Sequence, residues 1–115
     1  MDLAMEETPD AVVAALPENH LDAGNAEDFK RALETVIAGC DRVVLDIGPL
    51  EFVDSSGLGA IISCLRKLSA KHGQLKPCNA SRQVGKLFQM VRIHHIVEVF
   101  DNRQDALASF AAKPE

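Results

Sequence analysis

The sequence predicts an α/β fold, in which alternating helices cover a mostly parallel central sheet. Short apolar runs suited to strands alternate along the chain with longer runs whose apolar residues recur at helical spacing. The segments between strands are long enough to bring each new strand back parallel to the previous one. The apolar run at residues 43–47 is nearly unbroken, which is typical of a central strand covered on both faces.

The chain before that central strand is expected to form two strands and one helix. Residues 11–16 are a short apolar run that Pro17 closes, and a shorter strand is expected at residues 3–6. A helix should then begin after Asn25, a candidate N-cap, and end at Gly39, where a left-handed C-cap would lie. The apolar face of this helix consists of Phe29, Leu33, Val36 and Ile37.

A second helix is expected to follow Asp54 and to end at residues 71–73. Its expected core stripe consists of Leu58, Ile61, Ile62, Leu65 and Leu68. A further strand is expected at residues 75–80. Pro77 lies within it and indicates a sheet edge or a bulge, because proline donates no backbone hydrogen bond.

The last part of the chain is expected to contain a helix, a strand at residues 97–100 and a terminal helix capped by Asn102 with Asp105. The first of these helices carries Val84, Leu87, Phe88 and Val91, and the second carries Ala106, Leu107 and Phe110. Residues 1–115 are expected to form a single domain, with residues 1–8 and 111–115 frayed at its ends.

The charge balance argues against nucleic acid and lipid as direct partners. Seventeen acidic and twelve basic residues give a net charge of -5, and an acidic surface repels phosphate backbones and anionic membranes. Cys40, Cys64 and Cys78 are an odd number at wide spacing, as expected of buried free thiols in a reducing compartment. The sequence shows neither a basic secretory signal nor an apolar run of about 20 residues, so we expect a cytoplasmic protein without membrane insertion.

Residues 54–59, Asp-Ser-Ser-Gly-Leu-Gly, carry the most unusual chemistry in the chain. Two hydroxyl groups stand where a strand passes into a helix, beside glycines that leave the backbone uncovered. The ordinary interpretation is a helix N-terminus, where serine or aspartate side chains satisfy unpaired N–H groups. An enzyme is disfavoured, because a nucleophile elbow needs glycine where Val53 stands and a phosphate-binding loop needs a lysine that this segment lacks.

A second polar segment, residues 21–26, is expected to approach the first. Asp22 is a carboxylate in a short loop at the end of a strand, and such loops gather at one edge of an α/β sheet. If the first and third strand segments run parallel, Asp22 and Ser55 lie on the same rim.

The four histidines do not predict a metal site. None shows metal-ligand spacing with a cysteine or with another histidine, and the side chains of the adjacent His94 and His95 are expected to diverge. We therefore expect surface histidines without a catalytic or metal-binding role.

These segments together resemble the STAS domains, and specifically the small free-standing anti-sigma factor antagonists of bacteria. The landmarks extend over nearly the whole chain and are Leu-Asp-Ala at 21–23 with Asn-Ala at 25–26, the strand at 43–47, Phe-Val-Asp-Ser-Ser-Gly-Leu-Gly at 52–59 and Val-Phe-Asp at 99–101. Residues 17–20 depart from the family pattern of a glycine and a charged residue. Val91 and Arg92 replace a Thr-Gly pair, so the third helix is expected to end without the left-handed cap that glycine favours.

The resemblance implies a regulator switched by phosphorylation rather than an enzyme. Ser55 occupies the phosphoacceptor position of the family, and Ser56 is the alternative hydroxyl. Such a protein, when unphosphorylated, sequesters a kinase-type anti-sigma factor, which uses its own ATP to phosphorylate the serine and is then released. A PP2C-type phosphatase resets the cycle. The resemblance therefore implies no cofactor in this chain itself.

The resemblance also implies a contact surface for the partner at the rim and at the start of the second helix. This surface consists of Asp22, Ala23, Asn25, Asp54, Ser55, Ser56, Gly57, Gly59, Ala60 and Ser63. Leu58, Ile61 and Ile62 are expected in the core instead. Two alternatives stay open: a STAS subunit that docks on the ATPase of a transporter, and an enzyme that uses Ser55 as a nucleophile.

Overall fold

A four-stranded sheet lies at the centre of the structure, a computed structural model that describes residues 1–111. Its strands are β1 (Ala4–Glu7), β2 (Val12–Ala15), β4 (Arg42–Asp46) and β6 (Gln74–Cys78). They lie in the order β1-β2-β4-β6, with β1 antiparallel to β2 and the other two pairs parallel. The predicted α/β fold with a mostly parallel sheet is confirmed.

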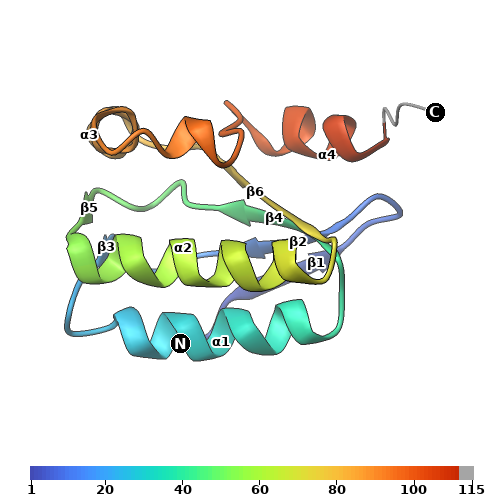
Figure 1. The fold of residues 1–115 in the computed structure, drawn as a ribbon, viewed down its shortest axis with the longest axis horizontal. Coiled ribbons are helices and arrows are strands. Elements are labelled where there is room, and N and C mark those ends of the chain that lie inside the picture. The colour runs from blue at the N-terminus through green and yellow to red at the C-terminus, as the bar shows by residue number, and fades with distance from the viewer. Residues whose placement is uncertain (112–115) are drawn as a thin grey trace.

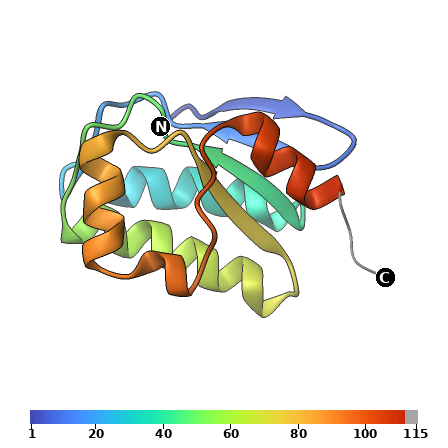
Figure 2. The same cartoon turned by 90° about the horizontal axis from the view of Figure 1, so that it is seen from above.

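Helices cover the sheet on both sides, as Figures 1 and 2 show. One side carries α1 (Ala26–Ala38) and α2 (Ser55–Ala70). The other side carries α3 (Arg82–Met90), the short 3-10 helix η1 (Ile93–His95) and α4 (Arg103–Ala111). The predicted helices are therefore all present. The predicted frayed tail falls mostly on residues 112–115, which lie outside the described residues, while residues expected to fray at the start of the chain form β1.

The two layers of helices explain the apolar run of the central strand. Val43 and Leu45 of β4 join the core that includes α1 and α2, whereas Val44 packs with Phe110 of α4. Successive side chains of a strand point to opposite faces, so a strand buried on both faces needs apolar residues at every position.

A separate two-stranded parallel sheet pairs β3 (His20–Leu21) with β5 (Phe52–Val53). The sequence did not predict this sheet, because strands of two residues are too short to show alternation. The pairing matters for function, since it places the loop that follows β3 beside the start of α2.

The predicted strand at residues 97–100 is wrong: only Phe100 forms a bridge, to Cys78 at the end of β6. Phe100 donates its N–H to the carbonyl oxygen of Pro77 and accepts a hydrogen bond from the N–H of Asn79. Extending this parallel ladder back to residue 98 would require a hydrogen bond from the backbone N–H of residue 77, which is a proline and has none. Pro77, which indicated a sheet edge, thus also prevents residues 97–100 from forming a further strand beside β6.

Two predicted helix ends differ in the structure. Gly39, at the end of α1, has a φ of -107° and is not left-handed, because a hydrogen bond from its N–H to the carbonyl oxygen of Val36 closes the last turn. Arg92, after α3, does adopt the left-handed conformation, with a φ of 59°. The expectation that α3 would end by another route is therefore wrong.

The buried carboxylate of Asp46, at the end of β4, attaches α4 to the sheet. It accepts hydrogen bonds from Arg103 Nε at 2.6 Å, Asn79 Nδ2 at 3.1 Å and the N–H of Gly48 at 2.9 Å. Burial alone would raise the pKa of Asp46, but these hydrogen bonds outweigh it and hold the pKa below its ordinary value.

Ile61, Leu65 and Leu68 of α2 are buried as predicted, but the buried face is shifted at its edge. Leu58 and Ile62 are only half-buried, whereas Gly57 and Ala60 are buried. A Cβ atom on Gly57 would lie 2.3 Å from the carbonyl oxygen of Leu21, so the absence of a side chain lets α2 contact β3 directly. A Cβ atom on Gly59 would meet nothing within 4 Å.

This difference predicts opposite effects for two alanine substitutions in one helical turn. Gly57→Ala should lower the free energy of unfolding by about 2 kcal/mol, because the added methyl group overlaps the backbone of β3. Gly59→Ala should raise it by up to about 1 kcal/mol through helix propensity. Urea denaturation of both variants measures the difference, and equal stabilities would contradict the close contact between α2 and β3.

Replacing Arg103 tests the attachment of α4. Arg103→Met should cost about 2 kcal/mol at neutral pH, because it leaves the buried Asp46 carboxylate without its charged partner. The folded-state pKa of Asp46 is lowered. The contribution of the Asp46–Arg103 ion pair to the free energy of unfolding is therefore fully present above the unfolded pKa of about 3.9. It is lost as the pH falls through the folded pKa of Asp46.

Denaturation of Arg103→Met and wild type from neutral to acid pH should show two curves that converge below about pH 4. Arg66→Met is the matched control, because Arg66 is exposed and makes no ion pair within residues 1–111. A cost as large for Arg66→Met would show that the Asp46 contact is not responsible.

Candidate functional site

Ser55 and Ser56 are both exposed in the first turn of α2. The helix is capped by the residue before them: Asp54 Oδ1 accepts the N–H of Gly57 at 2.9 Å. Within residues 1–111 neither serine hydroxyl makes a hydrogen bond. The start of α2 is therefore a helix N-terminus capped by an aspartate, as the ordinary interpretation allows, and the two serines do not provide the cap.

Asp54 also joins the start of α2 to the loop after β3. Its second oxygen, Oδ2, accepts the N–H of Ala23 at 3.2 Å, and its own N–H donates to the carbonyl oxygen of Leu21 at 3.1 Å. The predicted rim is confirmed in this respect: the loop that carries Asp22 lies beside the segment that carries Ser55.

The loop after β3 is held by its own side chains. Asp22 Oδ1 accepts the N–H of Gly24 at 2.9 Å, and Asp22 Oδ2 lies 3.1 Å from His20 Nδ1. Asn25 occupies the N-cap position of α1 but makes no side-chain cap; its Oδ1 accepts the N–H of Asp22, and its Nδ2 donates to the carbonyl oxygen of His20. His20, expected to be a surface histidine without a role, is thus a structural member of this loop.

The ten predicted contact residues divide by exposure. The exposed ones are Ala23, Ser55, Ser56 and Gly59, and the half-buried ones are Asp22, Asn25, Asp54 and Ser63. Gly57 and Ala60 are buried, with Ala60 only 6% exposed. Their inclusion in a contact surface is therefore wrong, because their small size serves the packing of α2 inside the molecule.

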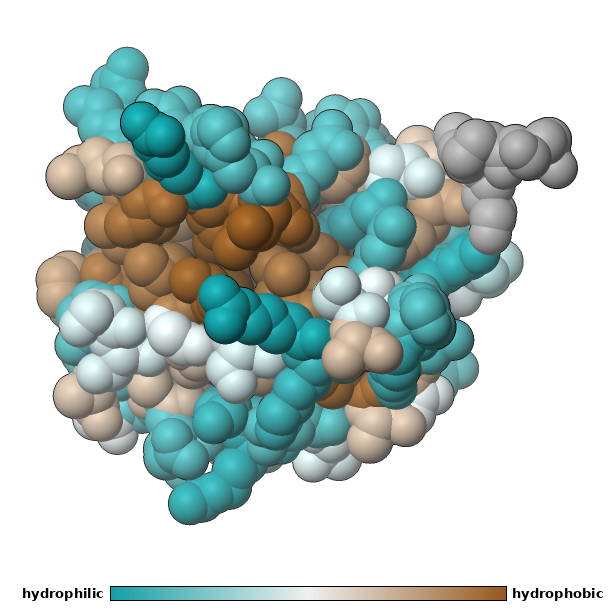
Figure 3. Space-filling model, in the orientation of Figure 1, coloured by the Kyte–Doolittle hydropathy of each residue, from teal (hydrophilic) through white to brown (hydrophobic). Residues whose placement is uncertain are grey.

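An apolar surface beside the serines was not predicted. Figure 3 shows a brown area between α2 and the segment that runs from α3 through η1. The large apolar side chains that α2, α3 and the residues after η1 leave half-buried or exposed include Leu58, Ile62, Leu87, Val91, Ile96 and Val97, here called the apolar surface. Ser55, Leu58 and Ile62 follow each other at spacings of three and four residues, which places them on one face of α2.

One signal in the sequence could have revealed this surface. The apolar and small residues of α2 occupy too much of its circumference to face a single core, so part of them must reach the surface. Leu58 and Ile62 were assigned to the core because large apolar residues usually lie there. Gly57 and Ala60 lie on the buried face of α2 together with the predicted Ile61, Leu65 and Leu68.

The titratable groups near the serines are two carboxylates and the imidazole of His20, which lies against Asp22. Asp54 directly precedes the serines, and Asp22 lies in the adjoining loop.

No three histidine, cysteine, aspartate or glutamate side chains come together as a metal site in residues 1–111. The rings of His94 and His95, at the end of η1, do not diverge as expected; their centroids lie 4.4 Å apart. In the described part of the chain no helix has the length and apolar character that crossing a membrane requires.

Two curated relatives carry names that describe a regulator. An anti-sigma F factor antagonist of Paenibacillus polymyxa is 34% identical over 68 residues, which cover 59% of this chain and 58% of that protein. BtrV of Bordetella bronchiseptica, named as a candidate anti-sigma factor antagonist, is 29% identical over 111 residues and is matched over 95% of its length.

Solved structures share the fold. The anti-sigma factor antagonist SpoIIAA in its unphosphorylated form superposes with a TM-score of 0.72 at 24% identity, covering 97% of this chain and 100% of that one. The phosphorylated form of SpoIIAA, from Bacillus, gives a TM-score of 0.69 over 94% of this chain and 98% of that one, again at 24% identity. Part of the murine anion transporter Slc26a9 gives 0.82 at 18% identity, covering 94% of this chain but 19% of the transporter.

The family model described as the STAS domain matches residues 2–106, which is nearly the whole described chain. This match agrees with the fold, with the paired loops around Asp22 and Asp54, and with the names of the relatives. The protein belongs to the STAS domain family.

Proposed function

We propose that the protein is an anti-sigma factor antagonist, a binding protein without catalytic activity, and that phosphorylation of Ser55 abolishes its docking. The observation that carries the proposal is the pair of exposed serines at the start of α2. Asp54 caps this helix, so neither serine hydroxyl is needed as a cap. The names of the two curated relatives support the general role. The existence of SpoIIAA in phosphorylated and unphosphorylated forms supports a phosphorylation switch in this fold.

The position of the serines favours a protein as the partner. Ser55 shares one face of α2 with Leu58 and Ile62, which belong to the apolar surface. Val91 and Ile96 in the same surface are 44% and 54% exposed. Exposed large apolar side chains next to a polar rim are typical of interaction sites, where their burial drives association.

The physical effect of the phosphate depends on what surrounds it. A phosphoserine carries about -1.5 to -2 charges at neutral pH. Free in solution, it lies at a helix N-terminus, where the helix dipole and unpaired N–H groups tolerate an anion. In a docked complex the same charge would be desolvated beside the carboxylates of Asp22 and Asp54, which costs binding free energy. The switch therefore acts by repulsion at the interface and needs no refolding.

The kinase and the phosphatase belong to the same proposal. The partner that binds the unphosphorylated site is a kinase-type anti-sigma factor that supplies ATP, and a PP2C-type phosphatase restores the hydroxyl. A second candidate function, docking on the ATPase of a transporter, is favoured by one observation, the fold shared with part of Slc26a9. The exposed serine pair favours the first function, because structural docking alone does not need a free hydroxyl there.

Binding measurements on serine variants test the switch. Ser55→Asp should weaken binding to the anti-sigma factor by about 10-fold or more, because it places a charge in the interface, while the melting temperature barely changes. Ser55→Ala should bind like wild type and resist release by ATP. Thr35→Asp, an exchange of a hydroxyl for a carboxylate at an exposed position of α1, is the matched control and should leave affinity unchanged. Undiminished binding of Ser55→Asp would refute the repulsion mechanism.

Intact-mass measurement tests the acceptor. Incubation with the anti-sigma factor and ATP should add one phosphoryl group to wild type and to Ser56→Ala, and none to Ser55→Ala. Modification of Ser55→Ala but not of Ser56→Ala would move the acceptor to Ser56. No phosphorylation, together with stable binding to a transporter ATPase, would favour the second function, whereas covalent labelling of Ser55 by a serine-directed phosphonate would favour an enzyme.

A further inference from the structure

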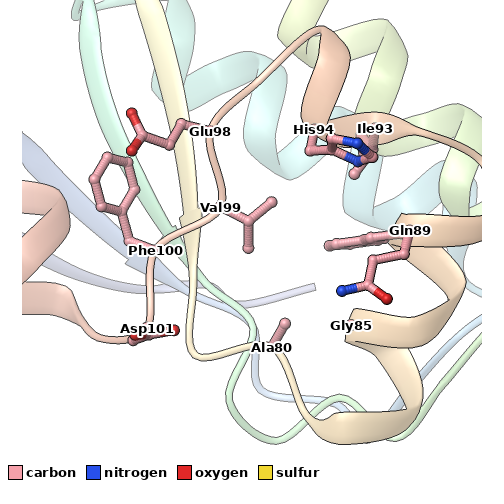
Figure 4. Close-up of a pocket in the computed structure, with 10 residues that line it drawn as sticks. Ala80, Gly85, Gln89, Ile93, His94, Glu98, Val99, Phe100 and Asp101 are labelled. Carbon is pink, nitrogen blue, oxygen red and sulfur yellow. The ribbon is translucent and has the colours of Figure 1, made fainter.

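A cavity of about 930 Å³ lies between α3 and the segment at residues 98–101, away from the serine pair. Figure 4 shows its lining residues. Apolar side chains of Ala80, Phe88, Ile93 and Val99 make up much of the wall. A volume of this size, with an apolar wall and a few polar groups, is in the range of small-molecule binding sites.

Gly85 lines this cavity from the middle of α3 and has no steric explanation. Its φ is not positive, and a Cβ atom there would meet nothing within 4 Å. Glycine inside a helix destabilises it relative to alanine. By contrast, a Cβ atom on Gly73 would come within 2.5 Å of the carbonyl oxygen of Asp41. Gly85 therefore keeps open a space that the fold itself does not require.

The polar groups around the space indicate the charge of its occupant. In Figure 4 the amide of Gln89 extends into the space toward Val99, and the carboxylate of Asp101 lies at the end near Ala80. The carboxylate of Glu98 points to the other side of the chain, beside Phe100. Neither lysine nor arginine lines the cavity in the described part of the chain. The Gln89 amide and the His94 imidazole can each form hydrogen bonds with a ligand of either charge. The full charge that faces the space is the carboxylate of Asp101, and it favours a cation.

We propose that this cavity binds a small organic cation with an apolar body, such as an aryl-alkyl ammonium ion. The body lies against Phe88, Ile93 and Val99, over the position where Gly85 lacks a side chain. The ammonium group lies at the Asp101 end, where it donates hydrogen bonds to the carboxylate. This site does not depend on the proposed switch, and its failure would leave the function of Ser55 unaffected.

Three probes of similar size and different charge test the proposal by NMR titration of the isotope-labelled protein: phenethylamine, phenethyl alcohol and hydrocinnamate. The amine, cationic at neutral pH, should shift the amide signals of residues 80–101 saturably, with a dissociation constant on the order of 1 mM or below. The alcohol should bind about 10-fold more weakly because it cannot pair with Asp101. The anion should give no saturable shifts.

Paired variants locate the ligand. Gly85→Leu should fill the space and abolish amine binding without lowering the melting temperature, because leucine favours the helix and has room there. Asp101→Asn should remove the preference for the amine over the alcohol. Glu98→Gln is the matched control, with the same change of charge on a side chain that points away, and should keep the preference.

Several results would overturn the proposal. They are the absence of saturable shifts with the amine, equal binding of amine and alcohol to wild type, or undiminished binding to Gly85→Leu. A loss of preference in Glu98→Gln as large as in Asp101→Asn would show a general charge effect rather than a site.

Discussion

The carboxylate of Asp54 holds the candidate site together, because its two oxygens bond to two different parts of the chain. One accepts the N–H of Gly57 and caps α2, and the other accepts the N–H of Ala23 in the loop after β3. Serines at helix starts usually provide such caps themselves. Because Asp54 provides it here, the hydroxyls of Ser55 and Ser56 can change their chemistry without breaking a contact on which the helix depends.

The same geometry requires α2 to lie directly against β3, and Gly57 makes that contact close enough. Because Gly57 and Ala60 share the buried face of α2 with Ile61, the side chains of Leu58 and Ile62 lie at its edge and are half-buried. The apolar surface beside the serines is thus a consequence of packing with small residues rather than an independent feature. The orientation of α2 therefore provides both the close contact with β3 and the half-buried apolar side chains beside the serines.

The sequence was most informative where one periodicity dominates. The unbroken run in β4, the helical stripes of α1 and α3, and the capping pair Asn102 and Asp105 all indicated their structures correctly. Errors arose where tertiary contacts decide between similar local patterns. The local sequence does not show that Pro77 prevents residues 97–100 from pairing with β6 as a strand. It also does not show that Arg92 adopts a left-handed backbone, or that Gly57 and Ala60 lie on the buried face of α2. The rim itself was predictable because parallel strands end at one edge, but the side-chain network around His20 was not.

The glycines within α2 and α3 fall into two groups, those that internal packing requires and those that it does not. Gly57 is explained inside the molecule, since a side chain there would overlap the backbone of Leu21. Gly59 and Gly85 have open space around them and ordinary helical backbones, so the folded chain alone would be more stable with alanine at either position. Gly59 lies beside the serine pair, and Gly85 lines the cavity under α3. A glycine at an open position leaves the helix backbone accessible from outside. The two glycines lie at the two sites proposed above, Gly59 beside the serine pair and Gly85 at the cavity.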